Sequence, residues 1–275
     1  MAQSLDASKS DALRLRILSA SILAPLAIVA AWLGGALLAA VTLVGAGLMG
    51  WEWGRLTDRG QFGGRGVLVA ATEVAGVGTA ILGAPMLALG VVLAGGVARV
   101  AWPGPERNAS LWAGIGTLWI GAACVGLLWL AADPAAGRAT ILWLFAVVWA
   151  TDSAAYLVGR WAGGPRLAPR WSPKKTWSGA LGGLAAAGLV GAITAKILGF
   201  SMPSPVLWLS MGLSVAVQAG DLAESAAKRR FGVKDTSGLI PGHGGLLDRL
   251  DGMLAAFVVA ALMTLARGAS PVMWS

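Results

Sequence analysis

The chain has 275 residues, of which 57% are hydrophobic and only 12% are charged. Soluble domains carry about 25% charged residues, so this composition excludes a protein that faces water on all sides. The formal net charge is +8, and the single cysteine, Cys124, excludes an intrachain disulfide framework.

Apolar runs of about 20 residues recur along the whole chain, and this length is sufficient for a helix that crosses a hydrocarbon layer. We therefore predict an all-α integral membrane protein with nine transmembrane helices. In this prediction, residues 1–140 provide spans one to five, residues 141–275 provide spans six to nine with the reactive loops, and both belong to one continuous membrane domain. The predicted spans are 17–33, 36–54, 67–83, 84–101, 110–131, 140–158, 179–199, 205–227 and 251–267.

Basic residues set the expected orientation, because cytoplasmic loops of membrane proteins are enriched in Lys and Arg. With a cytosolic N-terminus and nine crossings, 18 of the 21 basic residues lie inside, and only Arg138, Lys196 and Arg267 lie outside. The C-terminus is then outside, and the basic cytosolic face suits anionic lipids or solutes. Nucleic acid is a poor candidate partner, because no soluble domain exists to hold it. The short N-terminal tail favours a bacterial inner membrane.

The sixth and seventh predicted spans are joined by a basic loop. Asp152 lies near the end of the sixth span, and the loop ends in Ser172, Lys174, Lys175 and Thr176 just before a Gly-rich helix start. Helix N-termini favour anions, so this segment is a candidate phosphate clamp. The alternatives are that Asp152 pairs two helices through a cation and that the lysines only fix the topology.

Ionisable residues are concentrated around the eighth span and the loop that follows it, SAAKRRFGVKDTSGLIPGHGGLLDRLD at 225–251. Asp221, Ser225 and Lys228 are spaced i, i+4, i+7 and therefore share one helix face, with Glu224 nearby. The glycines and the proline of the loop allow a tight, non-helical path close to a ligand.

Two further carboxylates, Asp248 and Asp251, are spaced i, i+3 and converge if the ninth span begins at that point. Carboxylates at a membrane edge are costly and by default indicate function. Mg²⁺ often binds one or two carboxylates together with substrate phosphates, while basic side chains hold the other phosphate oxygens. The pattern therefore favours phosphoryl or nucleotidyl transfer. A solvated loop that only fixes topology would need Lys and Arg, but not aspartates beside them.

The residues between Ser225 and Asp251 form a long motif with fixed spacings. This motif resembles the signature of the phosphatidate cytidylyltransferase family, also called CDP-diacylglycerol synthases. The segments DSAAY, SPKKTW and GDLAES resemble the same family, so the likeness covers about 150–252, whereas the N-terminal half is similar only as membrane helices. Two positions depart from the pattern: Ala227 replaces a larger apolar residue, and Ser178 replaces a Glu found in many members. The motif comprises Ser225, Lys228-Arg229, Lys234-Asp235, Pro241-Gly242-His243-Gly244-Gly245 and Asp248-Arg249-Leu250-Asp251.

The resemblance implies that CTP and phosphatidate react at the cytosolic membrane face to give CDP-diacylglycerol and pyrophosphate. It implies Mg²⁺ held by Asp221, Asp248 and Asp251, with a second metal ion left open, and it suggests a homodimer. The catalytic residues that it implies are Asp221, Lys228, Asp248 and Asp251. The substrate-binding residues that it implies are Asp152, Ser172, Lys174, Lys175, Thr176, Ser225, Arg229, Lys234, Asp235, His243 and Arg249. For His243, direct substrate contact and a loop-fixing role are both open.

Other functions make different demands on the sequence. An ion-coupled transporter or channel, the main alternative, would line a path with Asp152, Asp221 and Glu224 and spread polar residues through the membrane depth. A CDP-alcohol phosphatidyltransferase needs further aspartates after the DRLDG at 248–252, and this chain has none. A lipid-binding scaffold would show no turnover. We expect Glu52 to pair with Arg55 or another cation, and Glu73 has no predicted role.

Overall fold

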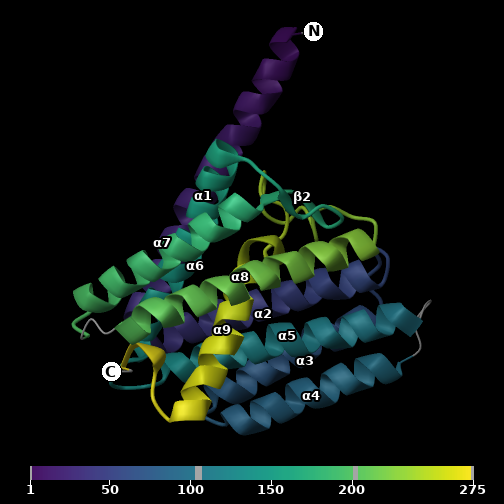
Figure 1. Cartoon of the computed structure of the whole chain (residues 1–275). Helices are drawn as coiled ribbons and strands as arrows, with labels where there is room; N and C mark the ends of the chain where they lie inside the picture. The colour runs from purple at the N-terminus through teal and green to yellow at the C-terminus, as the bar shows by residue number, and fades with distance from the viewer. Residues whose placement is uncertain (1, 103–106, 201–203, 274–275) are drawn as a thin grey trace.

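The computed structural model describes residues 2–102, 107–200 and 204–273, without the side chains of 2–14, 107 and 204. Within these ranges the chain forms nine α-helices, one antiparallel hairpin and a short 3₁₀-helix (Figure 1). The helices are α1 (Ala2–Leu33), α2 (Gly35–Thr57), α3 (Gly64–Ile81), α4 (Pro85–Ala101), α5 (Arg107–Ala131), α6 (Gly137–Ala162), α7 (Trp177–Ile197), α8 (Ser204–Arg230) and α9 (Leu247–Arg267). The strands are β1 (Arg166–Ala168) and β2 (Ser172–Thr176), and η1 is Pro271–Met273.

Six helices in the described part of the chain are long and apolar enough to cross a membrane, namely α2, α5, α6, α7, α8 and α9. The segments Leu18–Leu33 and Pro85–Ala101 are apolar but shorter. These helices confirm the prediction of an all-α integral membrane protein. The helix α3, which carries Arg65 and Glu73 within its 18 residues, is not among the six. The count of nine crossings therefore stays a prediction, and so do the sides of the two termini, which depend on that count.

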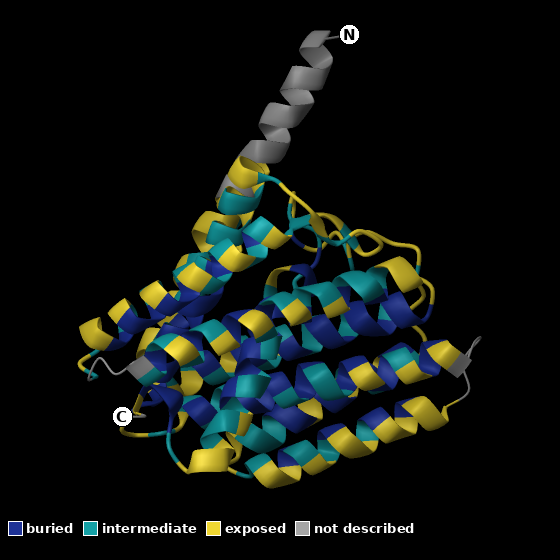
Figure 2. Ribbon diagram, viewed as in Figure 1, coloured by how far each residue is buried: buried dark blue, intermediate teal, exposed yellow. Residues whose placement is uncertain are grey.

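Exposed residues lie along the outer faces of the helices (Figure 2), and many of them are large and apolar. Leu82, Trp161 and Ile197 expose 86%, 88% and 78% of their surface. Large apolar patches are rare on soluble monomers, whereas a surface in contact with lipid hydrocarbon is not penalised by water. The outer surface therefore fits a membrane environment.

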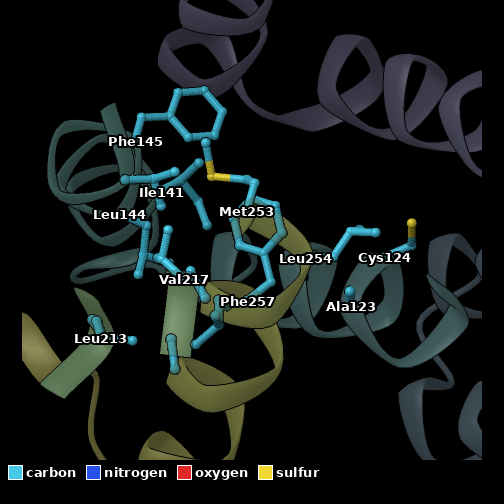
Figure 3. Packing of buried hydrophobic residues seen from close by; sticks show 14 of the residues in the cluster. Ala123, Cys124, Ile141, Leu144, Phe145, Leu213, Val217, Met253, Leu254 and Phe257 are labelled. Atoms are coloured by element: carbon cyan, nitrogen blue, oxygen red, sulfur yellow. The ribbon is translucent and has the colours of Figure 1, made fainter. Parts of the chain in front are cut away.

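The core lies where α5, α6, α8 and α9 meet (Figure 3). Phe145 of α6 and Phe257 of α9 approach with ring centroids 6.4 Å apart. Val217 of α8 and Cys124 of α5 are buried in the same cluster, so the single cysteine is a packing residue. The helices α2, α3 and α4 pack on α5, and α5 in turn packs on α9.

Two structural features differ from the sequence expectation at the ends of the predicted spans. The helix α8 continues to Arg230 and α9 begins at Leu247, so residues expected in the loop lie on helices. The segment expected to be an irregular loop contains the hairpin, in which Arg166 pairs with Thr176 and Ala168 with Ser172. Hydropathy alone misses both features, because polar helix ends and short polar strands are stabilised by tertiary contacts.

Glycines allow close approach of α2 and α3. A Cβ added at Gly54 of α2 would lie 2.8 Å from the Cα of Gly66 in α3, so backbone meets backbone there. Close backbone approach through small residues is a common way for membrane helices to associate.

We expect Gly54→Val to destabilise the protein by about 1–3 kcal/mol, because the new side chain must push α2 away from the backbone of α3. Gly78→Val is a matched control on α3, since nothing lies within 4 Å of its Cβ position. Thermal unfolding of the purified variants in detergent measures the difference. Equal melting temperatures for the two variants would contradict the close packing of α2 on α3.

Candidate active site

The polar face of α8 forms as the helical spacing predicts. The Ser225 hydroxyl donates to Asp221 Oδ1 at 3.4 Å, and Lys228 Nζ donates to Glu224 Oε2 at 2.9 Å. Glu224 is fully buried. The other carboxylate oxygen of Glu224, Oε1, has no hydrogen-bond donor among the described residues.

Asp248 joins this face to the loop between α8 and α9. Its Oδ1 accepts from Lys228 Nζ at 2.6 Å. Its Oδ2 accepts from the backbone N–H of Gly245 at 2.8 Å, from the backbone N–H of Thr236 at 2.9 Å and from the Thr236 hydroxyl at 3.0 Å. Both oxygens of Asp248 are therefore engaged in holding the loop against the two helices.

The glycines at the end of the loop are required by this close packing. Gly244 has a φ of +85°, in the left-handed region that favours glycine. A Cβ added at Gly245 would come within 2.6 Å of Glu52 Oε1 and would also collide with the Thr236 hydroxyl. Side chains at either position would separate the loop from the carboxylates that fix it.

Glu52 holds the start of α9, and the expectation that it pairs with Arg55 or another cation is wrong. Its carboxylate accepts from the backbone N–H groups of Leu246 at 2.9 Å and Leu247 at 2.7 Å, and from the Ser237 hydroxyl at 2.5 Å. The first N–H groups of a helix have no partner within the helix, and a negative charge there is favourable. Arg55 instead lies over the Trp51 ring, 4.9 Å from its centroid.

Three aspartates from three helices approach one another beside this loop. Asp152 of α6, Asp221 of α8 and Asp251 of α9 interact electrostatically, and Asp251 is also a neighbour of Glu224. Their mutual repulsion is costly unless cations balance it. In the described part of the chain, no group of three or more His, Cys, Asp or Glu side chains is arranged to hold a metal ion.

The hairpin supplies a cation to this cluster. Lys175 of β2 forms an ion pair with Asp221 of α8, which brings the two predicted polar loops together. Thr176 caps the start of α7, where its hydroxyl accepts from the backbone N–H of Gly179 at 3.1 Å. Ser178 contacts Thr176 at 3.0 Å.

The remaining predicted site residues lie at different distances from the cluster. Arg249 is exposed, and its Nε donates to the backbone carbonyl of His243 at 3.1 Å. Lys174, Lys234 and Asp235 are exposed at the surface, and Ser172 is half-buried in the hairpin. Lys174, Lys234 and Asp235 form no ion pair with the described part of the chain.

Arg229 lies apart from the carboxylates. Its Nε donates to the backbone carbonyl of Trp171 at 3.3 Å, and Nη1 donates to that of Val233 at 2.9 Å. Successive helix residues point about 100° apart, so Arg229 faces away from the side that carries Lys228. The structure therefore does not bring Arg229, a predicted phosphate ligand, together with the other site residues.

Sequence reasoning missed the partner of the single histidine. His243 Nδ1 lies 2.6 Å from the hydroxyl of Ser19 on α1. Ser19 is 224 residues away along the chain, and no spacing rule links the two. Half-buried His243 thus connects the motif loop to α1.

An apolar cavity of about 330 Å³ opens beside the aspartates. Its walls come from α1, α2, α5, α6 and α9, and only its end near the loop is charged, with Asp152, His243, Arg249 and Asp251 in the lining. The aspartates are therefore bordered on one side by a cavity that suits hydrocarbon chains and on the other side by the polar loop.

Comparison with known proteins extends the likeness over most of the chain. A sequence pattern that describes the Cytidylyltransferase family matches residues 14–266. The chain is similar to a phosphatidate cytidylyltransferase of Brucella suis, with 38% identity over 259 residues that cover 92% of each chain. It is also similar to one from Pseudomonas aeruginosa, with 37% identity over 274 residues that cover 93% of this chain and 98% of the relative. The similarity therefore includes the N-terminal half, beyond the motif.

We expect Glu52→Ala to destabilise the start of α9, because two backbone N–H groups lose their acceptor and each unsatisfied buried group costs about 1–3 kcal/mol. Hydrogen exchange at Leu246 and Leu247 should accelerate by at least about tenfold. Glu52→Gln keeps one acceptor oxygen and should be intermediate. Wild-type exchange rates in the Ala variant would mean that the carboxylate does not hold the helix.

Proposed function

Because the chain belongs to the cytidylyltransferase family, we propose that it transfers CMP from CTP to phosphatidate, giving CDP-diacylglycerol and pyrophosphate. The observation that carries the proposal is the position of the carboxylate and lysine cluster. It lies between a polar loop and an apolar cavity of about 330 Å³. A reaction between a lipid and a water-soluble polyanion requires a site with those two sides.

The chemistry needs no nucleophile from the protein. A phosphate oxygen of phosphatidate attacks the α-phosphorus of CTP and forms the new P–O bond. The bond from the α-phosphorus to the bridging oxygen of the β-phosphate breaks, and its electrons leave with pyrophosphate. Catalysis then depends on positioning and on neutralising the phosphate charge.

The donor set fits a hard divalent cation completed by substrate. Asp221 and Asp251 offer carboxylate oxygens near each other, and the buried Oε1 of Glu224 lacks a donor. Mg²⁺ is usually bound by one or two carboxylates together with substrate phosphates and water. When bound, the ion would neutralise charge on the phosphates of both substrates. Asp248 is the least available of the predicted ligands, because four hydrogen bonds already engage it.

Cations around the cluster are suited to phosphate binding. Lys175 is ion-paired with Asp221 and can exchange that partner for a phosphate oxygen. Arg249 lines the charged end of the cavity, where the phosphate of phosphatidate would lie. Lys174 and Lys234 are exposed, so each can reach a nucleotide that arrives from water. Lys228, between Glu224 and Asp248, serves in this proposal as a positioning residue.

The membrane geometry of the proposal follows from the same arrangement. We assign the loops of the cluster to the cytosol, where CTP is found, in a bacterial inner membrane. The homodimer that the resemblance suggests is part of the same proposal. A transporter would need polar side chains through the membrane depth, and the clustering at one end of the bundle favours the enzyme.

The direct test is the purified protein with Mg²⁺, phosphatidate and CTP labelled in the cytidine, with lipid-bound label and pyrophosphate both measured. We expect Asp221→Asn to lower turnover by at least about 100-fold, roughly 2.7 kcal/mol of barrier, because it removes a charge from the proposed cation site. Asp133→Asn is the matched control, since Asp133 lies in the turn before α6, away from the cluster, where its Oδ1 accepts from the backbone N–H of Ala135 at 2.9 Å. If no label enters the lipid with the wild-type protein, the proposed reaction is refuted.

The apolar cavity gives a separate prediction about the acyl chain. Ala27 of α1 lines the cavity and the adjacent Ile28, 40% exposed, does not. We expect Ala27→Trp to fill the space and reduce kcat/KM for phosphatidate with long acyl chains by about tenfold, a typical effect of pocket size. Short-chain phosphatidate and the KM for CTP should change little. Ile28→Trp is the control, and an equal loss for long and short chains in Ala27→Trp would exclude this cavity as the acyl site.

A further inference from the structure

The helix α1 is held at its C-terminal end and packs loosely along the rest of its described length. At the C-terminal end Ala30 is buried, and Arg138 of α6 lies over the Trp32 ring, 5.5 Å from its centroid. Toward the other end, Leu18 and Ile22 expose 59% and 65% of their surface. A segment with few buried apolar contacts separates from the rest of a fold at low cost, so this part of α1 is suited to move.

The same helix forms one wall of the apolar cavity beside the aspartates. Leu23 and Leu26 of α1 lie in the lining, together with Trp149 of α6. All three side chains are also exposed on the outside of the protein, so the cavity reaches the lipid-facing surface along the edge of α1. Because α1 packs mainly on α2 and α6, an outward movement of α1 would open the cavity to the bilayer between those two helices.

A pair of glycines joins α1 to α2. Gly34 and Gly35 have φ values of +63° and +50°, in the region that favours glycine. Apart from adjacent residues, no described atom lies within 4 Å of the Cβ position of either glycine. Hinges are a few residues at the ends of elements that absorb a change of backbone angles. This turn therefore has the conformational freedom and the space that a hinge of α1 requires.

A polar contact holds α1 against the motif loop. The Ser19 hydroxyl lies 2.6 Å from His243 Nδ1 and 3.5 Å from the backbone carbonyl oxygen of Pro241. His243 also lies in the lining of the cavity, so α1, the loop and the cavity meet at this point. A typical intramolecular hydrogen bond changes an equilibrium by a factor of about two to ten. The contact is therefore strong enough to favour the closed position of α1 and weak enough to break.

The proposed lipid substrate requires an entry from the side. If the acyl chains of phosphatidate passed through the polar loop, they would be exposed to water. Each CH₂ group exposed in this way lowers the population by a factor of about four. Long acyl chains therefore enter the cavity directly from the bilayer.

We propose that α1 is a gate between the bilayer and the catalytic cavity. It swings about Gly34 and Gly35, breaks the contact of Ser19 with His243, admits the acyl chains of phosphatidate and closes again. The lipid product leaves through the same opening. The identity of the lipid rests on the proposed function, whereas the movement of α1 is tested without any reaction.

The single cysteine of the chain can report on the gate. Cys124 of α5 lines the cavity and is 3% exposed, so N-ethylmaleimide, a small membrane-permeant thiol reagent, reaches it when α1 opens. The rate of labelling is measured by mass spectrometry on the full chain in phosphatidylcholine vesicles without substrate. We expect Ser19→Ala to accelerate labelling by about fivefold, which corresponds to about 1 kcal/mol and to the loss of one hydrogen bond.

Two controls separate gate opening from a general loosening of the protein. Ser21→Ala changes an exposed hydroxyl on the same helix and should leave the rate unchanged. Ala123 precedes Cys124 on α5 (both labelled in Figure 3) and is fully buried, but it does not line the cavity. When Ala123→Cys and Cys124→Ala move the thiol there, Ser19→Ala should have no effect.

A fixed helix that only faces lipid predicts equal labelling of Cys124 in the wild-type protein and in Ser19→Ala. That result would overturn the gate. Equal acceleration at positions 123 and 124 would also overturn it, because the whole protein would then have loosened.

A reversible bridge tests whether turnover needs the movement. Ser19→Cys and Pro241→Cys, in a protein with Cys124→Ala, are joined by a short bis-methanethiosulfonate reagent that dithiothreitol removes. We expect the bridge to lower turnover of long-chain phosphatidate in vesicles by at least about tenfold, and its removal to restore turnover. Short-chain phosphatidate dispersed in water should be affected less, since its chains do not need the lateral opening.

Full turnover of the long-chain substrate with the bridge in place would contradict the gate. An equal loss for both substrates would contradict it too, because the bridge would then only disturb the loop. If the protein without the bridge makes no CDP-diacylglycerol, the proposed reaction fails, and the labelling of Cys124 still decides whether α1 opens.

Discussion

The double ion pair of Lys228 is the interaction on which the rest of the site depends. Its ammonium group lies 2.9 Å from Glu224 on its own helix and 2.6 Å from Asp248 on α9. All three side chains are largely buried, so the attraction is strong, but removing one partner would leave an uncompensated charge, a change that typically costs about 3–5 kcal/mol. The position of α9 relative to α8 is therefore fixed by electrostatics as well as by packing.

Once Asp248 is fixed, the polar loop is fixed with it. The oxygen that does not contact Lys228 holds the backbone of Thr236 and Gly245, and Glu52 of α2 holds the next turn from the other side. Asp221 and Asp251 are left to interact with Lys175, with each other and with what enters from outside. The same motif thus contains carboxylates that hold the loop and carboxylates that remain suited to bind a cation.

The helices and the polar face of α8 could be predicted from the sequence. Apolar runs predict the helices, and the i, i+4, i+7 spacing of Asp221, Ser225 and Lys228 predicts their common face, because both follow from local geometry. The hairpin could not be predicted, since its short strands have no alternating pattern. The contacts of Glu52 with Leu247 and of Ser19 with His243 join residues about 200 apart, and no local rule contains that information.

The sequence by itself determined that the protein is an all-α membrane protein, and that its reactive groups gather near the ends of its last helices. Those properties depend on composition and on spacing within single helices. Only the tertiary structure decided which carboxylates are already engaged, which side of α8 Arg229 faces, and that an apolar cavity opens beside Asp152 and Asp251. Burial, charge compensation and cavities are properties of several helices together, so they exist only once the helices have packed.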